Sequence, residues 1–382
     1  MILDETTITS SAAPTSTRKH LKAKQLLSHP AFGSNEWHLP PTKSGHASIN
    51  GTSQRPGGPF KIFYEIHGTG PIRLLLIMGL GAYRTAWKRQ TKYFGHAPER
   101  ASKYSVLVFD NRGVAKSDKP TCRYSTREMA LDTVELLGHV GWLEESVVQA
   151  TLAKAYGKAA GEAAEAGVKP MRDLNVAGVS MGGMIAQEVG LLLAPRIQSL
   201  FLVSTAPRIV RTVPFIENLR QRINMFIPRD IDVQLEEIAY RLFSKEFLET
   251  EDRENEDPKM NFPTTRDRFA ASELAKRQDK EGFTRKGFVL QAIAAGWHHK
   301  SKAQLQEMVR EIGAERICVM HGSIDQMITF RHFALFKEDM GEDSGVTFKE
   351  WDGAGHVLMW EKETAFNEAM QDFLEKMQKI DG

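Results

Sequence analysis

The pattern G-x-S-x-G surrounds Ser180 in the stretch VAGVSMGGMIAQE, residues 176–188. An apolar run ends at Val179 and an apolar helical pattern begins just after the serine, so the motif lies where a strand would turn into a helix. A serine on such a turn can act as a nucleophile, because Gly178 and Gly182 remove side chains that would collide with a strained backbone. The alternative is an ordinary turn in which Ser180 caps the helix. The motif alone leaves both interpretations open.

A serine hydroxyl becomes a good nucleophile only beside a base, and that base needs a third group to orient it. For a nucleophile on a strand-to-helix turn of this kind, the expected order along the chain is serine, acid, histidine. Asp325 follows the apolar run RICVMH, and His356 lies in a loop after the alternating run VTFKEW. Gly353 and Gly355 let that loop fold back over the strand ends. The sequence therefore predicts a triad in which Ser180 is the nucleophile, His356 the base and Asp325 the acid.

Other titratable residues in the second half of the chain compete with these. His321 is expected to end its strand inside the edge of the sheet, in a structural role. His298 and His299 lie at a predicted helix end, where exposure to solvent or contact with substrate is expected rather than base catalysis. Asp352 is too close to His356 in sequence to orient it easily, so a role in a turn is expected. The segment after the preceding strand, VSTAPR, has no carboxylate, which favours the later aspartate.

Two backbone amides are candidates for stabilising a negatively charged oxygen. The N–H of Met181 begins the helix after the nucleophile, where the helix dipole assists it. The second candidate is the N–H of Leu80, in the glycine-containing turn Met78-Gly79-Leu80-Gly81. A turn without a catalytic role is the alternative for this segment.

Asp110 and Arg112 follow another predicted strand, in the stretch FDNRGVAKSD. Catalysis is one interpretation of this carboxylate and guanidinium. A buried pair that fixes the turn is the expectation, because paired buried charges are commonly structural.

Short apolar runs separated by helical patterns predict the elements that must position these residues. The predicted strands are residues 46–50, 60–66, 74–79, 104–110, 174–180, 197–205, 316–321 and 346–351. Such runs are typical of a parallel sheet covered by helices on both faces. A helix is predicted over 125–143, with Ser125 as its N-cap and Glu128 at the spacing of a capping box.

The rhythm of strands and helices divides the chain into regions. Residues 207–300 contain helical patterns at 215–226, 233–247, 264–278 and 287–297, which predict a helical cap, or lid, inserted between the fourth and fifth parallel strands. The core is then expected to comprise residues 45–206 and 301–382. Residues 1–44 are expected to form a polar tail that becomes an arm on the domain, and the Ala-rich residues 144–171 lengthen the connection before Ser180.

The composition excludes several classes of protein. Lys and Arg number 50 and Asp and Glu 48, with the basic residues scattered, so the charge is unlike that of a nucleic-acid-binding protein. The only cysteines, Cys122 and Cys318, form no metal-binding or disulfide pattern and fit a reducing compartment. The longest apolar run, LLLIMGL, is too short to span a bilayer. Early acidic residues argue against secretory and mitochondrial targeting, so a cytoplasmic protein is expected.

The ordered motifs of the chain resemble those of the α/β-hydrolase-fold superfamily, in particular serine esterases and lipases with a helical cap. The matching segments, in family order, are MGLG at 78–81, DNRGVAKSD at 110–118, GVSMGG at 178–183, HGSID at 321–325 and GAGH at 353–356. They cover roughly residues 45–380. Three residues depart from the usual pattern: Met78 and Val179 stand where the family often has histidine, and Ala115 where it has a glycine.

The resemblance implies an α/β fold, with a mostly parallel sheet of eight strands, helices on both faces and an inserted helical cap. It also implies that Ser180, Asp325 and His356 form the triad and that the amides of Leu80 and Met181 form the oxyanion hole. Ser180 argues against dehalogenases and epoxide hydrolases, which use an aspartate nucleophile. Related members with the serine triad include cofactor-free haloperoxidases, and their peracid chemistry stays open as an alternative.

These inferences predict a carboxylic ester hydrolase that acts through an acyl-enzyme on a small to medium apolar ester, lactone or thioester. No metal and no organic cofactor is expected, and the expected partner is this small-molecule acyl substrate. Candidate lining residues of the cap are Phe215, Met225, Phe226, Phe243 and Trp297. For most of them, packing between helices is the expected role. The alternatives are an acyltransferase with an alcohol or amine acceptor, a lyase or cyclase, and a non-catalytic ligand-binding or partner-binding protein.

Overall fold

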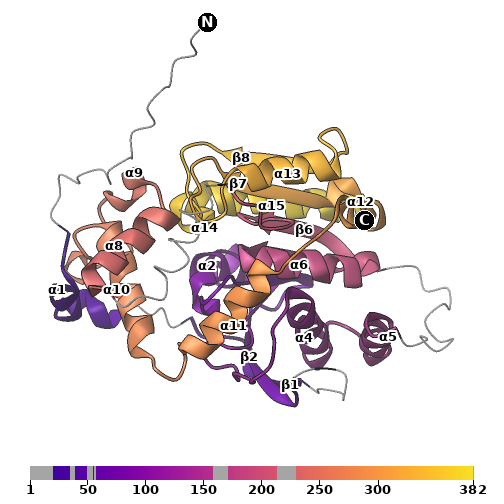
Figure 1. Cartoon of the computed structure of the whole chain (residues 1–382), viewed down its shortest axis with the longest axis horizontal. Coiled ribbons are helices and arrows are strands. Elements are labelled where there is room, and N and C mark those ends of the chain that lie inside the picture. Colours follow the sequence, from indigo (N-terminus) through magenta and orange to yellow (C-terminus); the bar gives the residue numbers. More distant parts are fainter. Residues whose placement is uncertain are drawn as a thin grey trace, which may run out of the picture.

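The computed structural model describes residues 20–34, 39–49, 55, 57–157, 171–212 and 229–381. Its centre is an eight-stranded sheet in the order β1-β2-β4-β3-β5-β6-β7-β8 (Figure 1). β1 pairs with β2 and β2 with β4 in antiparallel fashion, and every later pair is parallel. The α/β fold with a mostly parallel sheet that the sequence predicts is therefore confirmed.

The predicted strand positions are correct to within a few residues. The strands are β1 Lys43–Ile49, β2 Phe60–His67, β3 Ile72–Ile77, β4 Tyr104–Phe109, β5 Leu174–Val179, β6 Ile197–Val203, β7 Ile317–Gly322 and β8 Thr347–Trp351. Every residue of β5, β6 and β7 is buried, as their continuous apolar runs indicate.

Helices cover both faces of the sheet, because successive apolar residues of each strand point to opposite sides. Leu75 and Ile77 of β3 belong to the core on one face, and Leu74 and Leu76 belong to the core on the other. The first face is covered by α4 Thr126–His139, α6 Met181–Leu192, α12 Lys302–Ile312 and α13 Arg331–Met340. The second is covered by α2 Lys88–Gly95, α14 Leu358–Glu361 and α15 Glu363–Asp381.

The remaining described elements outside residues 207–300 contribute less to covering the sheet. They are α1 Ala23–Leu27, α3 Pro98–Ala101, α5 Glu145–Ala155 and the 3-10 turns Pro30–Ser34, Arg84–Trp87, Ala194–Arg196 and Ala314–Arg316. α5 occupies part of the predicted 144–171 connection, and residues 158–170 lie outside the described residues.

The predicted N-cap of α4 is present, but the capping box is not completed. The hydroxyl of Ser125 accepts a hydrogen bond from the backbone N–H of Glu128 at 3.1 Å. The carboxylate of Glu128 turns away from the helix start, accepting from the hydroxyl of Tyr156 at 2.7 Å and from Arg55 at 3.4 Å. The buried guanidinium of Arg55 competes with the helix N-terminus for this carboxylate.

Helices fill the described part of the chain between β6 and β7, and we call residues 207–300 the cap segment. It contains α8 Ile231–Leu242, α9 Lys245–Leu248, the 3-10 turn Pro258–Met260, α10 Thr265–Gln278 and α11 Arg285–Gly296. Figure 1 shows α8, α9 and α10 grouped to one side of the sheet, while α11 runs back towards the core. The predicted helix at 215–226 lies outside the described residues.

The helix predicted over 233–247 is broken in two. The carbonyl of Leu242 accepts from the backbone N–H groups of His356 (2.7 Å) and Val357 (3.2 Å), which lie outside the cap segment. Phe243 is extended, and Ser244 caps α9 through a hydrogen bond from Phe247 N. The break is therefore a tertiary effect, because the backbone at the end of α8 bonds to another part of the chain.

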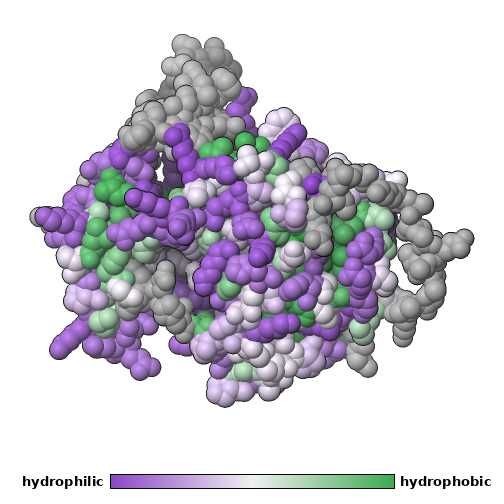
Figure 2. Space-filling view, turned by 90° about the horizontal axis from the view of Figure 1, so that it is seen from below, coloured by the Kyte–Doolittle hydropathy of each residue, from purple (hydrophilic) through white to green (hydrophobic). Residues whose placement is uncertain are grey.

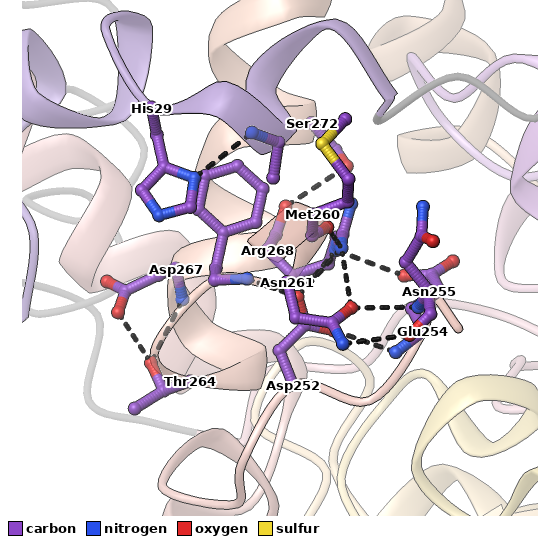
Figure 3. A network of polar contacts seen from close by, with 12 residues as sticks. His29, Asp252, Glu254, Asn255, Met260, Asn261, Thr264, Asp267, Arg268 and Ser272 are labelled. Atoms are coloured by element: carbon purple, nitrogen blue, oxygen red, sulfur yellow. Dashed lines mark hydrogen bonds and ion pairs between the residues drawn. The ribbon is translucent and has the colours of Figure 1, made fainter. Parts of the chain in front are cut away.

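Residues 20–34, the described part of the predicted N-terminal arm before residue 39, lie on the cap segment. The backbone N–H of Leu21 donates to Asp267 at 3.0 Å, and the ring of His29 stacks on Phe262 with centroids 4.6 Å apart. Leu26 is fully buried against α8 and α10. Figure 3 shows His29 beside the polar network of this region, in which Arg268 bonds to Asp252, Met260 and Asn261.

Asp110 and Arg112 are both buried, but they do not form the pair that the sequence suggests. Asp110 accepts from the backbone N–H and the guanidinium of Arg84, both at 2.9 Å. Arg112 donates to both carboxylate oxygens of Asp132, and Arg55 also contacts Asp132. Each residue fixes its turn through a partner from a distant part of the sequence, and no local pattern could identify that partner.

Among the described residues, no helix is long and apolar enough to cross a membrane. On the face shown in Figure 2, hydrophilic residues predominate and hydrophobic residues occur in separate patches.

The Asp132 contacts predict a large stability effect. Asp132→Asn removes the carboxylate charge that pairs with the buried guanidinium of Arg112, while Arg55 keeps its acidic partners Glu128 and Glu135. The free energy of unfolding should therefore fall by about 3–5 kcal/mol. Urea denaturation followed by circular dichroism measures this change. The control is Glu338→Gln, which breaks the half-exposed pair with Arg331 and should leave the midpoint unchanged. Equal midpoints for the two variants would contradict the prediction.

Candidate active site

Ser180 lies on a strained turn between β5 and α6. Its φ of 57° and ψ of −124° are values that non-glycine residues rarely adopt. The residue is only partly buried, and its hydroxyl makes no hydrogen bond to the start of α6. The helix-cap alternative considered from the sequence is therefore wrong, because the hydroxyl does not bond to the helix that follows.

Close backbone packing explains the glycines on either side of Ser180. A Cβ atom on Gly178 would lie 2.2 Å from the carbonyl oxygen of Gly182, and one on Gly182 would lie 2.2 Å from the carbonyl oxygen of Ile77. The turn therefore requires glycine at both positions, as the G-x-S-x-G motif predicts. Thr205 adds a further constraint by donating its hydroxyl hydrogen to the carbonyl of Ser180 at 2.7 Å.

Gly182→Ala should destabilise the fold, because the carbonyl of Ile77 belongs to a central strand and has no room to move. We expect a loss of about 3 kcal/mol in the free energy of unfolding, the upper end of ordinary overpacking. Gly296→Ala, at the end of α11 with no atom within 4 Å of the new Cβ, is the matched control. Thermal and urea denaturation of both variants measure the difference, and similar stability of the two would refute the packing argument.

The structure brings Asp325 and His356 together at the carboxyl ends of the strands. The Nδ1–H of His356 donates to Asp325 Oδ2 at 2.7 Å. The other carboxylate oxygen accepts from the backbone N–H groups of Met327 (2.8 Å) and Ile328 (2.9 Å). Both side chains are buried, so the carboxylate orients the imidazole and leaves Nε2 available as the proton acceptor.

The serine and the histidine are not hydrogen-bonded to each other in this structure. Among the described residues, no hydrogen bond joins the hydroxyl of Ser180 to His356. Catalytic hydrogen bonds are often long in structures without substrate and shorten when a substrate binds. Ser180 follows β5 and His356 follows β8, and these strands run parallel in one sheet. Both residues therefore lie beyond the carboxyl ends of the strands.

The loop that carries His356 is held from two sides. Leu242 of the cap segment accepts from the backbone of His356, as described above. Glu361 Oε2 accepts from the backbone N–H of Gly355 (2.9 Å) and of Ser244 (3.3 Å), so a single carboxylate joins the loop to the cap segment. These contacts fix the backbone of the candidate base directly.

The predicted oxyanion loop lies beside the nucleophile. A Cβ on Gly79 would lie 3.1 Å from the Cβ and 3.6 Å from the Oγ of Ser180, so the loop passes directly over the serine side chain. Leu80 is partly buried, and Met181 is the first residue of α6, where an N–H has no partner within the helix. The side chain of Asn111 anchors the start of the loop by donating to the carbonyl of Met78 at 2.8 Å.

Ala115 explains how this chain departs from the family pattern without losing the turn. Its φ is 47°, a value that favours glycine. The backbone N–H of Ala115 donates to the carbonyl of Gly282 in the cap segment at 2.8 Å, and Val114 forms a β-bridge with Phe283. The surrounding structure therefore stabilises a strained alanine where glycine is usual.

His321, the nearest competing histidine, is structural in its contacts. It is fully buried in β7, donates Nε2–H to the carbonyl of Ile328 at 2.7 Å and lies 3.4 Å from Asp325 Oδ2. Burial lowers its pKa, so it stays neutral. It bonds to the loop that carries Asp325, in agreement with the structural role expected from the sequence. Asp352 lies in a turn, as expected, and accepts a hydrogen bond from the hydroxyl of Ser323.

His298 differs from the expectation of a solvated or substrate-lining residue. It is buried, its Nδ1 lies 2.9 Å from the hydroxyl of Thr126, and Lys300 pairs with the neighbouring Glu188 at 2.6 Å. Burial, together with the nearby Lys300, lowers the pKa of His298 to about 3. His299, next in the chain, is exposed as expected.

His298 should make stability sensitive to acid. Its folded-state pKa of about 3 lies below the ordinary 6.5, so between these values the unfolded chain binds a proton that the folded chain does not. The free energy of unfolding should therefore fall by about 1 kcal/mol per pH unit as the pH drops below 6.5. Urea titrations from pH 7 to pH 4 should show a shallower slope for His298→Gln than for wild type and for His299→Gln. Parallel slopes would contradict this assignment.

The candidate lining residues of the cap are placed only in part. Phe243 packs against Phe247, Phe269 and Trp360, so it belongs to a hydrophobic core where α8 and α9 meet α14. Trp297 is 73% exposed and lies against the guanidinium of Arg123. Phe215, Met225 and Phe226 lie outside the described residues.

The most important site contacts that the sequence does not predict come from Leu242, Glu361 and Gln291, none of which belongs to a motif. Leu242 acts through its backbone, which leaves no signature in residue type. Glu361 lies five residues after His356, at the end of the short helix α14. A glutamate at this spacing does not by itself indicate that it bonds to the loop of His356. Within the described residues, no cluster of His, Cys, Asp and Glu side chains could hold a metal ion.

Comparison with known proteins places the chain among hydrolases. A family model described as "Alpha/beta hydrolase family" matches residues 66–369. A protein of Azorhizobium caulinodans named "Putative carbamate hydrolase RutD" is 26% identical over 148 residues, which are 39% of this chain and 42% of that protein. The aligned region thus spans less than half of that relative.

Many solved structures have a similar fold, and two of them serve as examples. A thermophilic esterase from Thermogutta terrifontis superposes with a TM-score of 0.59 and 18% identity, over 88% of this chain and 99% of its own. The enol-lactonase from Burkholderia xenovorans LB400 has a TM-score of 0.56 and 17% identity, over 83% of this chain and 97% of its own. At identities of 18% and 17%, these superpositions show a shared fold and nothing more.

Proposed function

Because the chain belongs to the alpha/beta hydrolase family, we propose that it is a serine hydrolase that cleaves a carboxylic ester, lactone or thioester through an acyl-enzyme. One observation carries the proposal. Ser180 has a strained backbone and a hydroxyl that does not cap α6, and the buried Asp325–His356 hydrogen bond lies beyond the carboxyl ends of the same sheet. A serine that only ended a strand would not need this backbone strain.

In the proposed reaction, His356 Nε2 takes the hydroxyl proton as Ser180 Oγ attacks the carbonyl carbon of the substrate. The tetrahedral intermediate collapses when the imidazolium gives that proton to the leaving oxygen or sulfur, which departs and leaves an acyl-serine. Water then gives a proton to His356 and attacks the acyl carbon. The acid leaves as the proton returns to Ser180, and throughout these steps Asp325 orients the imidazole.

The negative oxygen of both intermediates would bind the N–H groups of Met181 and Leu80. Met181 begins α6, whose dipole favours negative charge at that end. The contact of Gly79 with the Ser180 side chain supports the place of Leu80 in this role. Donors held in advance at the position of the developing charge typically contribute more to the rate than any other single group.

The substrate class rests on the relatives and on the cap segment. The similar proteins are named as an esterase, an enol-lactonase and, provisionally, a carbamate hydrolase, all of which act at a carbonyl carbon. We propose that residues 207–300 act as a cap over the site and that residues 45–206 and 301–382 form the catalytic core. In the described part of the cap segment, α11 and the end of α8 contact the loops beside the site.

The proposal predicts covalent labelling and loss of activity at one serine. A fluorophosphonate probe should give an adduct that mass spectrometry locates on Ser180. Ser180→Ala should lower kcat for p-nitrophenyl acetate by on the order of 10⁴-fold or more, because the nucleophile is removed. His356→Gln should lose a similar factor, while the exposed His299→Gln should keep wild-type kcat.

Folded Ser180→Ala with wild-type turnover, or wild-type protein that no probe labels, would overturn the hydrolase assignment. Product analysis with and without added alcohol separates hydrolysis from acyl transfer. A new ester formed at the expense of the acid would identify an acyltransferase that uses the same residues.

A further inference from the structure

We propose that Gln291 of α11 is a positioning residue that holds the oxyanion loop in its working conformation. The inference rests on the proposed function and adds a cap residue to the site. Gln291 is completely buried, although its side chain is polar and belongs to a helix of the cap segment. A buried amide must have its hydrogen bonds satisfied, so its partners indicate its role.

Both ends of the Gln291 amide bond to loops beside the nucleophile. Its Oε1 accepts from the backbone N–H of Gly81 at 2.8 Å, and its Nε2 donates to the carbonyl of Arg112 at 2.8 Å. A backbone N–H can only donate and a carbonyl can only accept, so these partners fix the orientation of the amide. Only an uncharged side chain of this length with both a donor and an acceptor can bridge them.

A second hydrogen bond holds the other end of the proposed oxyanion loop. Asn111 holds the carbonyl of Met78 at the start of the oxyanion loop, and Gln291 holds the N–H of Gly81 at its end. Leu80, whose N–H is the proposed oxyanion donor, lies between these two anchors. Gly81 has a φ of 64°, and because glycine adopts positive and negative φ about equally readily, the bond to Gln291 favours one of these conformations over the other.

α11 lies close enough to make this bond rigid. A Cβ on Gly287 would lie 1.9 Å from the carbonyl oxygen of Gly113, so the helix backbone contacts that turn directly. The ring of Phe288 would lie 2.8 Å from a Cβ on Gly81. Movement of α11 would therefore move Gly81 as well, so the position of the cap segment and the geometry of the oxyanion hole are coupled.

The test replaces the amide and keeps its volume. Gln291→Met removes both hydrogen bonds, and we expect kcat to fall about 10- to 100-fold with KM changed less than about threefold, below the cost of deleting an oxyanion donor itself. Gln291→Glu would place a carboxylate oxygen against the carbonyl of Arg112 in a fully buried position, so it should not restore the activity lost in Gln291→Met. The matched control is Gln234→Met, because Gln234 bridges Arg229 and Arg277 within the cap segment, away from the oxyanion loop.

Two further readouts separate positioning from stability. A trifluoromethyl ketone forms a negatively charged adduct with the serine, so Gln291→Met should weaken its binding by the same factor as kcat/KM, while affinity for the product acid stays unchanged. Amide hydrogen exchange of the peptide containing Gly81 should be faster in this variant, a result that does not depend on any activity.

Unchanged exchange at Gly81, or a loss of kcat that Gln234→Met reproduces, would overturn the inference. If Ser180 is not labelled but exchange at Gly81 still rises, the proposed function fails while the anchor stands. If wild-type protein is labelled and active and Gln291→Met has wild-type kcat and ketone affinity, the positioning role fails while the proposed function stands.

Discussion

The candidate site depends on one close contact between backbones. β5 turns into α6 so tightly that Gly178 and Gly182 nearly touch, and Gly182 also lies against the carbonyl of Ile77 in the neighbouring strand β3. This contact forces Ser180 into a conformation with positive φ, and it places the N-terminus of α6 directly beside Ser180. A strained residue of this kind costs on the order of 1–3 kcal/mol and persists only because the buried central strands around it are rigid.

The second constraint is the way in which the cap segment joins the core. The carbonyl of Leu242 holds the His356 loop, and the side chain of Gln291 holds the end of the oxyanion loop. Two parts of the proposed catalytic machinery are therefore bonded to residues of the cap segment. The described helices of this segment therefore support the backbone of the candidate site directly, and if the proposed function holds, substitutions in them would change the reaction rate without contacting the substrate.

Much of the fold could be predicted because its signals are local. Continuous apolar runs identified the buried strands, the glycine spacing identified the strand-to-helix turn at Ser180, and Ser125 identified the start of α4. Predictions failed where a distant partner competes with local preference. The helix over 233–247 breaks because His356 takes the carbonyl of Leu242, and the carboxylate of Glu128 leaves its capping box for Tyr156 and Arg55.

The sequence by itself determined the order and type of the candidate catalytic residues. It also determined the glycines that make the strand-to-helix turn at Ser180 possible, because this turn depends on neighbours within a few positions. Tertiary structure alone decided which charged groups form pairs. Asp110 bonds to Arg84, and Arg112 bonds to Asp132. It also decided that His298 is buried and that the side chain of Gln291 accepts a hydrogen bond from Gly81, beside the candidate nucleophile. The physical reason is that a hydrogen bond between residues 210 positions apart, such as that from Gly81 to Gln291, leaves no periodic or local trace in the chain.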